Sequence, residues 1–432
     1  MAVRTAQEPP IVWTQNYVPL AATRPFAEPH PGPANRYPNG TDTSVNLFFD
    51  EMFSNELWDM MVEQTNTYYE QQKAANPNKH KSKWSPVEKG EIKVFIGIII
   101  YIVKLPRMHM YWSTDTLIHQ QSVSAIISRT RFLQIWRYFH LADNEHALPR
   151  ENPSFDKIYR VRKFLNIIME NAQKLYRLTK NILIDESMVP HKGRLSFKQY
   201  IKNKPVKWGI KLWVLCEAKT GYIYKFQVYL GKEWLNTEHN LARRVVKHLV
   251  SNLENKYHHL YMDNFYCDPY LFQELETKKV LACGTIRCNR KGFPKDLVIT
   301  KAMEKRMNRG DFTWRCSGNL VAHAWFDNHP VYLITTIHPP ESIGAPCTIQ
   351  RKSGTGGALQ EIPCPPAEID YTNYMGGVDL ADQVTSTFSV IRKSRKAWKK
   401  LFYYGLEVSL LNSYIIYRQT VNNPKDFLNY RL

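Results

Sequence analysis

The sequence predicts an α/β protein in which helical segments flank a mixed sheet and a mainly β segment interrupts that sheet. Apolar residues recur with helical spacing from about residue 44 to 178, the spacing changes to two residues from about 180, and helical spacing returns beyond about 386. Single hydrophobic cores rarely grow beyond about 250–300 residues, so a chain of 432 residues is expected to hold more than one domain.

The N-terminal part of the sequence is predicted to form a segment without regular secondary structure, followed by helices. Residues 1–43 are rich in proline without apolar periodicity, so we expect them to be extended or disordered. Residues 44–178 are the first part of a predicted helical domain, in which Ser54 can cap a helix. Ser85-Pro86-Val87-Glu88 is a capping box with proline at the first helical position, and it predicts the start of a buried helix. Further helical patterns cover 128–139 and 159–178.

Residues 179–290 are predicted to form the first part of an α/β core. The apolar run before Asp185 predicts a strand, and alternating residues on both sides of Thr220-Gly221 predict a hairpin. The next elements are a helix at 240–253, a strand that ends at Asp263, a helix at 269–275 and a strand at 280–286. This order, with an acid after the first and fourth strands, is that of a ribonuclease H-like core.

Residues 291–368 are predicted to be a mainly β insertion domain. Strand candidates at 312–316, 321–326 and 331–336 are separated by turn signals. Gly354-Thr355-Gly356-Gly357 is interpreted as a flexible connector, because it lacks the GKS or GKT ending of a phosphate-binding loop.

Four aspartates are the predicted catalytic and metal-binding residues: Asp185, Asp263, Asp379 and Asp382. The last two lie in 369–385, where the core is expected to resume. They are three residues apart, which on a helix places their Cβ atoms about 5–6 Å apart on one face. Taken alone, an aspartate after a strand is more often a turn former or a helix cap, and Asp379 could cap a helix beginning at Leu380 while also binding metal.

The four acids together predict a site for two Mg²⁺ ions, or Mn²⁺ in their place, because these ions prefer hard oxygen ligands. Two such ions about 3.5–4 Å apart can clamp the attacking and leaving oxygens of an in-line displacement. In a strongly basic protein, this chemistry indicates a metal-dependent nuclease or strand transferase acting on phosphodiesters. No separate histidine base is required, and a G-x-S-x-G nucleophile motif is absent.

The charge, hydrophobic runs and cysteine content indicate which partners and which cell compartment to expect. Lys and Arg number 58 against 39 Asp and Glu, which leaves a net charge of +19 and favours a polyanion, with nucleic acid first and an anionic membrane second. The apolar run 94–103 is too short for a spanning helix, which needs about 20 residues, so no membrane association is expected. The seven cysteines form no C-x-x-C spacing, and we expect reduced core thiols in an intracellular compartment.

Three clusters of polar and basic residues are predicted to contact DNA. They are Lys192, Arg194 and Lys207 after Asp185; Arg287, Asn289, Arg290 and Lys291 after the strand at 280–286; and Arg392, Lys393, Arg395, Lys396, Lys399 and Lys400 beyond Asp382. The last cluster opens 386–432, the predicted second part of the helical domain. Its alternative interpretation is a solvated helix start or a nuclear-import signal.

Blocks around these residues resemble the piggyBac transposase family, and the match extends from about 44 to 420. The blocks are 185–194, 204–211, 262–266, 284–292 and 375–383. The resemblance implies that Asp185, Asp263 and Asp379 bind two Mg²⁺ ions and that Asp382 is a further required acid. It also implies cutting and joining of double-stranded DNA at transposon ends and TTAA targets, with a DNA hairpin intermediate.

The family resemblance further implies a homodimer in the nucleus, with a dimerisation and DNA-binding domain assembled from 44–178 and 386–432. Family members commonly end in a Cys/His-rich zinc domain; this sequence shows none, so we expect no zinc site in it. The alternative is a domesticated, transposase-derived DNA-binding or chromatin protein without catalysis. A third interpretation, an RNA-directed nuclease, rests on the fold alone.

Overall fold

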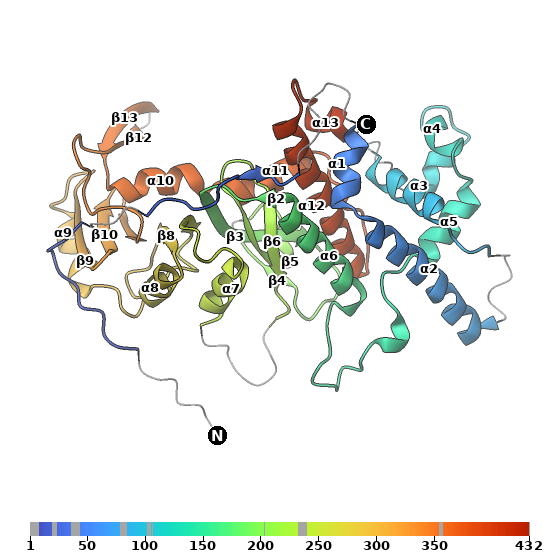
Figure 1. Ribbon diagram of the computed structural model, residues 1–432, viewed down its shortest axis with the longest axis horizontal. Helices are drawn as coiled ribbons and strands as arrows, with labels where there is room; N and C mark the ends of the chain where they lie inside the picture. Colours follow the sequence, from blue (N-terminus) through green and yellow to red (C-terminus); the bar gives the residue numbers. More distant parts are fainter. Residues whose placement is uncertain are drawn as a thin grey trace.

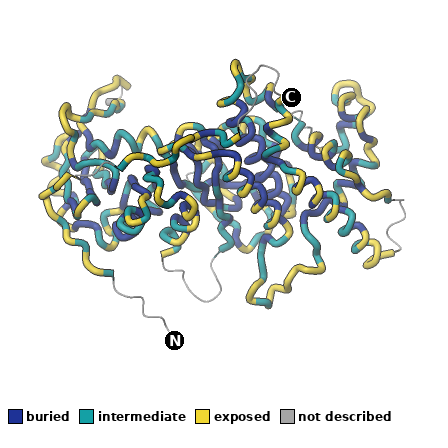
Figure 2. The backbone as a smooth tube through the Cα atoms, viewed as in Figure 1, coloured by how far each residue is buried: buried dark blue, intermediate teal, exposed yellow. Residues whose placement is uncertain are grey.

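The computed structural model describes residues 8–19, 24–35, 44–77, 84–101, 105, 107–202, 204–231, 240–353 and 357–431. Figure 1 shows an elongated molecule with helices at one end, a sheet in the middle and a small β hairpin at the other end. Buried residues run continuously from the helical end through the sheet (Figure 2). Within the described residues, no helix has the length and apolar character needed to cross a bilayer.

The helical end combines segments from both ends of the chain. Its helices are α1 (Val45–Met52), α2 (Asn55–Ala75), α3 (Lys89–Ile100), α4 (Gln121–Ser124), α5 (Arg129–Tyr138), α6 (Tyr159–Leu175), α12 (Ala397–Thr420) and α13 (Phe427–Arg431). Helix α12 contacts α1 and α6 and is buried on nearly all sides, as expected of a helix that is apolar around its circumference. The first and last helical segments therefore share one core (Figure 1).

The predicted start of the buried helix at residues 85–88 is one turn too early, because α3 begins at Lys89. Asn66 holds the backbone of Val87 outside the helix, accepting from its N–H at 2.8 Å and donating to its carbonyl at 3.0 Å. Glu88 becomes the cap, and its N–H donates to the Glu91 carboxylate at 3.4 Å.

The central sheet is mixed, which confirms the α/β class. Its strands are β3 (Asn181–Pro190), β4 (Gln199–Tyr200), β5 (Trp208–Glu217), β6 (Ile223–Val228), β7 (His258–Met262), β8 (Val280–Thr285), β9 (Phe312–Ser317), β10 (Leu320–Phe326) and β11 (Pro330–Thr335). The order is β4-β5-β3-β7-β8-β11-β10-β9, with β6 on β5. Strand β7 is parallel to both β3 and β8, and the other pairs are antiparallel.

The segment predicted as a mainly β insertion domain, 291–368, shares the central sheet with the core. Strands β9, β10 and β11 extend the central sheet, because β11 pairs with β8 and satisfies its outer backbone groups. Among the described residues of this segment, β12 (Thr348–Ser353) and β13 (Ala358–Pro363) form a two-stranded sheet of their own. Residues 354–356, most of the predicted glycine connector, lie outside the described residues.

Helices cover the sheet on both sides (Figure 1). Helices α10 (Pro366–Tyr374) and α11 (Gly377–Thr387) cross one side, and α7 (Leu241–Val250) and α8 (Pro269–Thr277) lie on the other. Helix α11 contacts β3 and β5, while α8 contacts β8. These contacts bring α11 against the strand that carries Asp185.

The described part of the N-terminal segment, residues 8–19 and 24–35, is extended and bonded to the body of the protein. Thr14 forms a backbone bridge with Cys316, and the Trp13 indole donates to the carbonyl of Gly292 at 2.8 Å. A short strand, β1 (Gly32–Pro33), pairs with β2 (Tyr176–Arg177). Of the two expected states, extended or disordered, these described residues have the extended one, because exposed strand and loop edges supply hydrogen-bond partners.

Candidate metal centre

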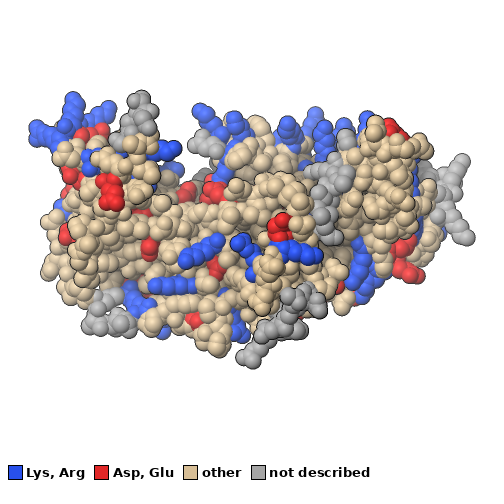
Figure 3. Space-filling view, turned by 90° about the horizontal axis from the view of Figure 1, so that it is seen from above, with Lys and Arg blue, Asp and Glu red and all other residues tan. Residues whose placement is uncertain are grey.

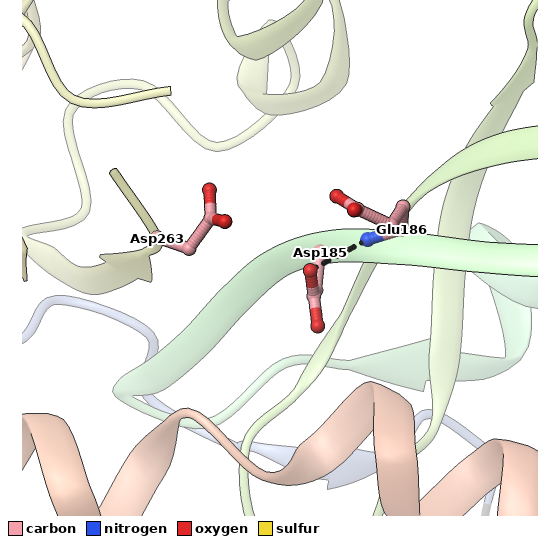
Figure 4. Close-up of side chains that lie close together, drawn as sticks. All are labelled: Asp185, Glu186 and Asp263. Atoms are coloured by element: carbon pink, nitrogen blue, oxygen red, sulfur yellow. Dashed lines mark hydrogen bonds between the residues drawn. The ribbon is translucent and has the colours of Figure 1, made fainter. Parts of the chain in front are cut away.

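Parallel pairing of β3 and β7 brings two predicted acids together. The register places Ile184 opposite Met262, so the next residues along, Asp185 and Asp263, lie side by side. One carboxylate oxygen from each of Asp185, Glu186 and Asp263 lies within 4.8 Å of the other two (Figure 4). Three carboxylates at this spacing form a donor set suited to a hard divalent cation.

Glu186 was not among the predicted ligands. Neighbouring residues of a strand point to opposite faces, and Figure 4 shows Asp185 and Glu186 on opposite sides of the β3 ribbon. Asp263 can approach both because β7 ends at Met262, and the chain turns there. Glu186 accepts from the Tyr266 hydroxyl at 3.4 Å and lies 3.8 Å from Lys211 Nζ. The only feature of the sequence that could have indicated Glu186 as a ligand is its adjacency to Asp185. Strand periodicity argues against that inference, because adjacent residues of a strand point to opposite faces.

Helix α11 places the other two predicted acids beside β3. The Ser187 hydroxyl donates to Asp382 at 2.7 Å. Lys204 links the remaining pair, with its Nζ 3.6 Å from Asp185 Oδ2 and 3.4 Å from Asp379 Oδ1. The four aspartates therefore meet around one stretch of β3, with Asp379, whose side chain is 70% exposed, on the solvent side.

The alternative role of Asp379, as the cap of a helix beginning at Leu380, is wrong, because α11 begins at Gly377 and Asp379 lies in its first turn. The start of the helix touches the sheet directly. A Cβ on Gly377 would lie 2.7 Å from Leu183 Cδ2 and 2.8 Å from the carbonyl oxygen of Glu217. The absent side chain at this position thus sets how closely α11 approaches β3.

Burial makes the charged forms of Asp185, Asp263 and Asp382 costly. It raises the pKa of Asp185 to about 7, with Lys204 opposing the shift and Glu186 adding to it. Burial likewise raises the pKa of Asp382 to about 6, against the Ser187 hydrogen bond, and raises the pKa of Asp263. Burial lowers the pKa of Lys204, but Asp185 and Asp379 outweigh it and the net shift is upward. A bound divalent cation would offset the repulsion that this cluster contains.

The predicted DNA contacts within 192–207 and 287–291 differ in accessibility. Lys192, Arg194, Lys207, Arg287, Asn289 and Lys291 are exposed. Arg287 donates to the Asn264 side chain at 3.1 Å, and Lys291 lies 3.4 Å from the Glu8 carboxylate. Arg290 donates to the carbonyls of Asn264 and Phe265 at 3.0 and 2.8 Å, so it supports the turn that follows Asp263.

The basic cluster beyond Asp382 is split between surface and core. Lys393, Arg395 and Lys396 are exposed, whereas Arg392, Lys399 and Lys400 are each less than 9% exposed. Arg392 donates to the Tyr111 hydroxyl at 2.9 Å. Lys399 donates to the carbonyl of Trp136 at 3.3 Å and lies 4.3 Å from its ring centroid. The prediction of phosphate contact is therefore wrong for these three residues. The first turn of α12 directs Lys399 and Lys400 into the helical core, and Arg392, in the segment before α12, is held there by Tyr111.

Lysine and arginine gather along one edge of the face shown in Figure 3. A hollow interrupts this edge, and acidic side chains are visible within it. This edge offers a surface of the sign needed for a polyanion.

Comparisons with known proteins give one consistent family. Residues 45–414 match the model of the family described as Transposase IS4. The chain is 29% identical over 405 residues to human piggyBac transposable element-derived protein 3, covering 90% of this chain and 63% of that protein. It is 27% identical over 387 residues to human piggyBac transposable element-derived protein 2, covering 86% of this chain and 60% of that protein. The chain thus spans less than two thirds of either relative.

A solved structure shares the fold. It is the cryo-EM structure of a piggyBac transposase synaptic complex with hairpin DNA, with a TM-score of 0.75 and 24% sequence identity. The match covers 93% of this chain and 81% of that one, so the helical end, the sheet and the helices over it recur together.

Proposed function

Since the chain belongs to the piggyBac transposase family, we propose that it cuts and joins double-stranded DNA at a metal centre built on Asp185, Asp263, Asp379 and Asp382. The observation that carries this proposal is the meeting of Asp185 and Asp263 at one level of the sheet, with two α11 acids beside them. Acids from three distant segments converge where a purely structural role would leave costly buried charge.

The ligand roles follow from position. Asp185 and Asp263 would hold one ion, with Glu186 as an additional oxygen donor. Asp185 and Asp379 would hold a second, at the position where the Lys204 ammonium now lies between them. Asp382, bonded to Ser187, would orient α11 against β3 and stay close enough to support this ligand set. When bound, Mg²⁺ or Mn²⁺ would supply Lewis-acid activation of the attacking and leaving oxygens.

The proposed substrate is a transposon end or a TTAA target, which contains an easily deformed TA step. Exposed cations of the predicted clusters, such as Lys207 and Arg287, would position the DNA backbone. We extend the proposal to a homodimer acting in the nucleus, where such DNA is found.

The test is cleavage of a TTAA-flanked duplex carrying family terminal repeats, in Mg²⁺ and in EDTA. Asp263→Ala should abolish cleavage and leave DNA binding intact. Glu274→Ala, which removes a half-exposed acid of α8, is the matched control and should cleave like wild type. If wild type binds DNA but does not cleave it in Mg²⁺ or Mn²⁺, the catalytic proposal fails and a DNA-binding protein derived from a transposase is left.

A further inference from the structure

Two cysteines face each other at the base of the β12–β13 hairpin. The register pairs Thr348 with Pro363, so the next pair is Cys347 with Cys364. The backbone N–H of Cys364 donates to the carbonyl of Cys347 at 3.0 Å, as in a hydrogen-bonded antiparallel pair. Cα atoms of such a pair lie about 5.5 Å apart, which is inside the range of about 4.4–6.8 Å that a disulfide spans.

The two side chains share one face of the hairpin. Cys364 is buried with Trp325 and Ile362, and Cys347 packs against the same small cluster. Ile349, two residues beyond Cys347 on its strand, contacts this cluster too, as the alternation of side chains requires. Both thiols therefore lie between the hairpin and the end of the central sheet.

We propose that Cys347 and Cys364 are a redox-sensitive thiol pair that a peroxide closes into a reversible cross-strand disulfide. The Cys347 thiol, the more exposed of the two, is oxidised by two electrons to a sulfenic acid while the peroxide is reduced to water. The Cys364 sulfur then attacks the Cys347 sulfur, the S–S bond forms, and the sulfenic oxygen leaves as water. A dithiol reductant reverses the reaction.

Burial, with a contribution from Cys347, raises the pKa of Cys364 to about 12. Few Cys364 thiolates exist at neutral pH, so Cys347 is the thiol expected to react with peroxide first. If Cys347 reacts first, peroxide should give different products in a variant that retains only Cys347 of this pair and in one that retains only Cys364.

The disulfide would act on the segment that leads to the acids of α11. Cys364 lies two residues before Pro366, where α10 begins, and α10 leads into α11 with its acids (Figure 1). Arg351 of the hairpin already bonds Glu368 of α10 at 2.8 Å. Closing the hairpin would therefore fix the strand that enters the α10–α11 pair.

The experiment uses the full chain. It is treated with hydrogen peroxide, blocked with N-ethylmaleimide under denaturing conditions, digested without reductant and analysed by mass spectrometry. We expect a Cys347–Cys364 cross-linked peptide that disappears with dithiothreitol. The control thiols Cys267 and Cys283, which are fully buried and bond backbone carbonyls at 3.6 Å, should stay reduced.

Single variants keep the proposal open to refutation. Cys364→Ala should leave a Cys347 sulfenic acid that dimedone traps, and Cys347→Ser should leave Cys364 as a free thiol. Recovery of both wild-type thiols as maleimide adducts, or of Cys347 as a sulfinic acid without cross-linking, overturns the proposal. Because the readout is a covalent bond, it is independent of whether the protein cleaves DNA.

Discussion

Asp185→Asn is expected to stabilise the metal-free protein at alkaline pH even as it abolishes the proposed cleavage. Burial raises the pKa of Asp185 from 3.8 to about 7, so above pH 7 the fold contains a carboxylate that is less stable there than in the unfolded chain. A difference of roughly three pH units, at about 1.4 kcal/mol per unit, corresponds to about 4 kcal/mol. This is the upper limit of the gain in the free energy of unfolding.

The gain has a defined pH dependence. In wild type, the contribution of the Asp185 carboxyl to stability is fully present below its unfolded pKa of 3.8 and is lost as the pH rises through about 7. Asparagine does not titrate. The difference between the variant and wild type should therefore be largest above pH 7 and shrink toward zero as the pH falls to about 4.

The assay is urea unfolding followed by tryptophan fluorescence, in EDTA, from about pH 4 to about pH 8. Asp379→Asn is the matched control, because its side chain is 70% exposed and its ion pair with Lys204 is worth at most about 1 kcal/mol. Both variants should lose cleavage, but only Asp185→Asn should gain stability. A gain that does not change with pH, or a wild type more stable than the variant at pH 8 in EDTA, would refute the reasoning.

Three further predictions concern the surroundings of the centre. Gly377→Ala should lower stability by about 1–3 kcal/mol in urea unfolding, because its Cβ meets the sheet at 2.7 Å, whereas Gly376→Ala, with nothing within 4 Å, should behave like wild type. Lys393→Ala should reduce the slope of log affinity for duplex DNA against log salt by about 1, and Lys399→Met should leave it unchanged because Lys399 is buried. Equal slopes for these two variants would contradict the split between surface and core. Mg²⁺ should raise the melting temperature, and Lys204→Met should reach half of that rise at a several-fold lower Mg²⁺ concentration than wild type. The reason is that no ammonium then has to leave the acids when the ion binds. A higher Mg²⁺ concentration for the variant would show that Lys204 assists metal binding.

The sequence by itself determined the local helices and strands and the proximity of Asp185 and Asp263 in the candidate metal centre. The strands before Asp185 and Asp263 are short apolar runs, and acids that follow neighbouring parallel strands meet at one sheet edge, so their proximity follows from periodicity and element order. The aspartates three residues apart likewise lie on one helix, α11, because i, i+3 spacing is a local property.

Only the tertiary structure decided which further groups join them and which cations reach solvent. Glu186 lies in the centre because β7 ends beside it, and Lys204 lies there because its segment folds back toward α11. Strand alternation and charge alone do not predict the position of either residue. Lys399 is buried because neighbouring helices enclose the first turn of α12, although its sequence is among the most basic in the chain. Periodicity encodes which face of an element is apolar, but the partner that covers that face, and the edge on which β11 adds to β8, depend on contacts between residues far apart in the chain.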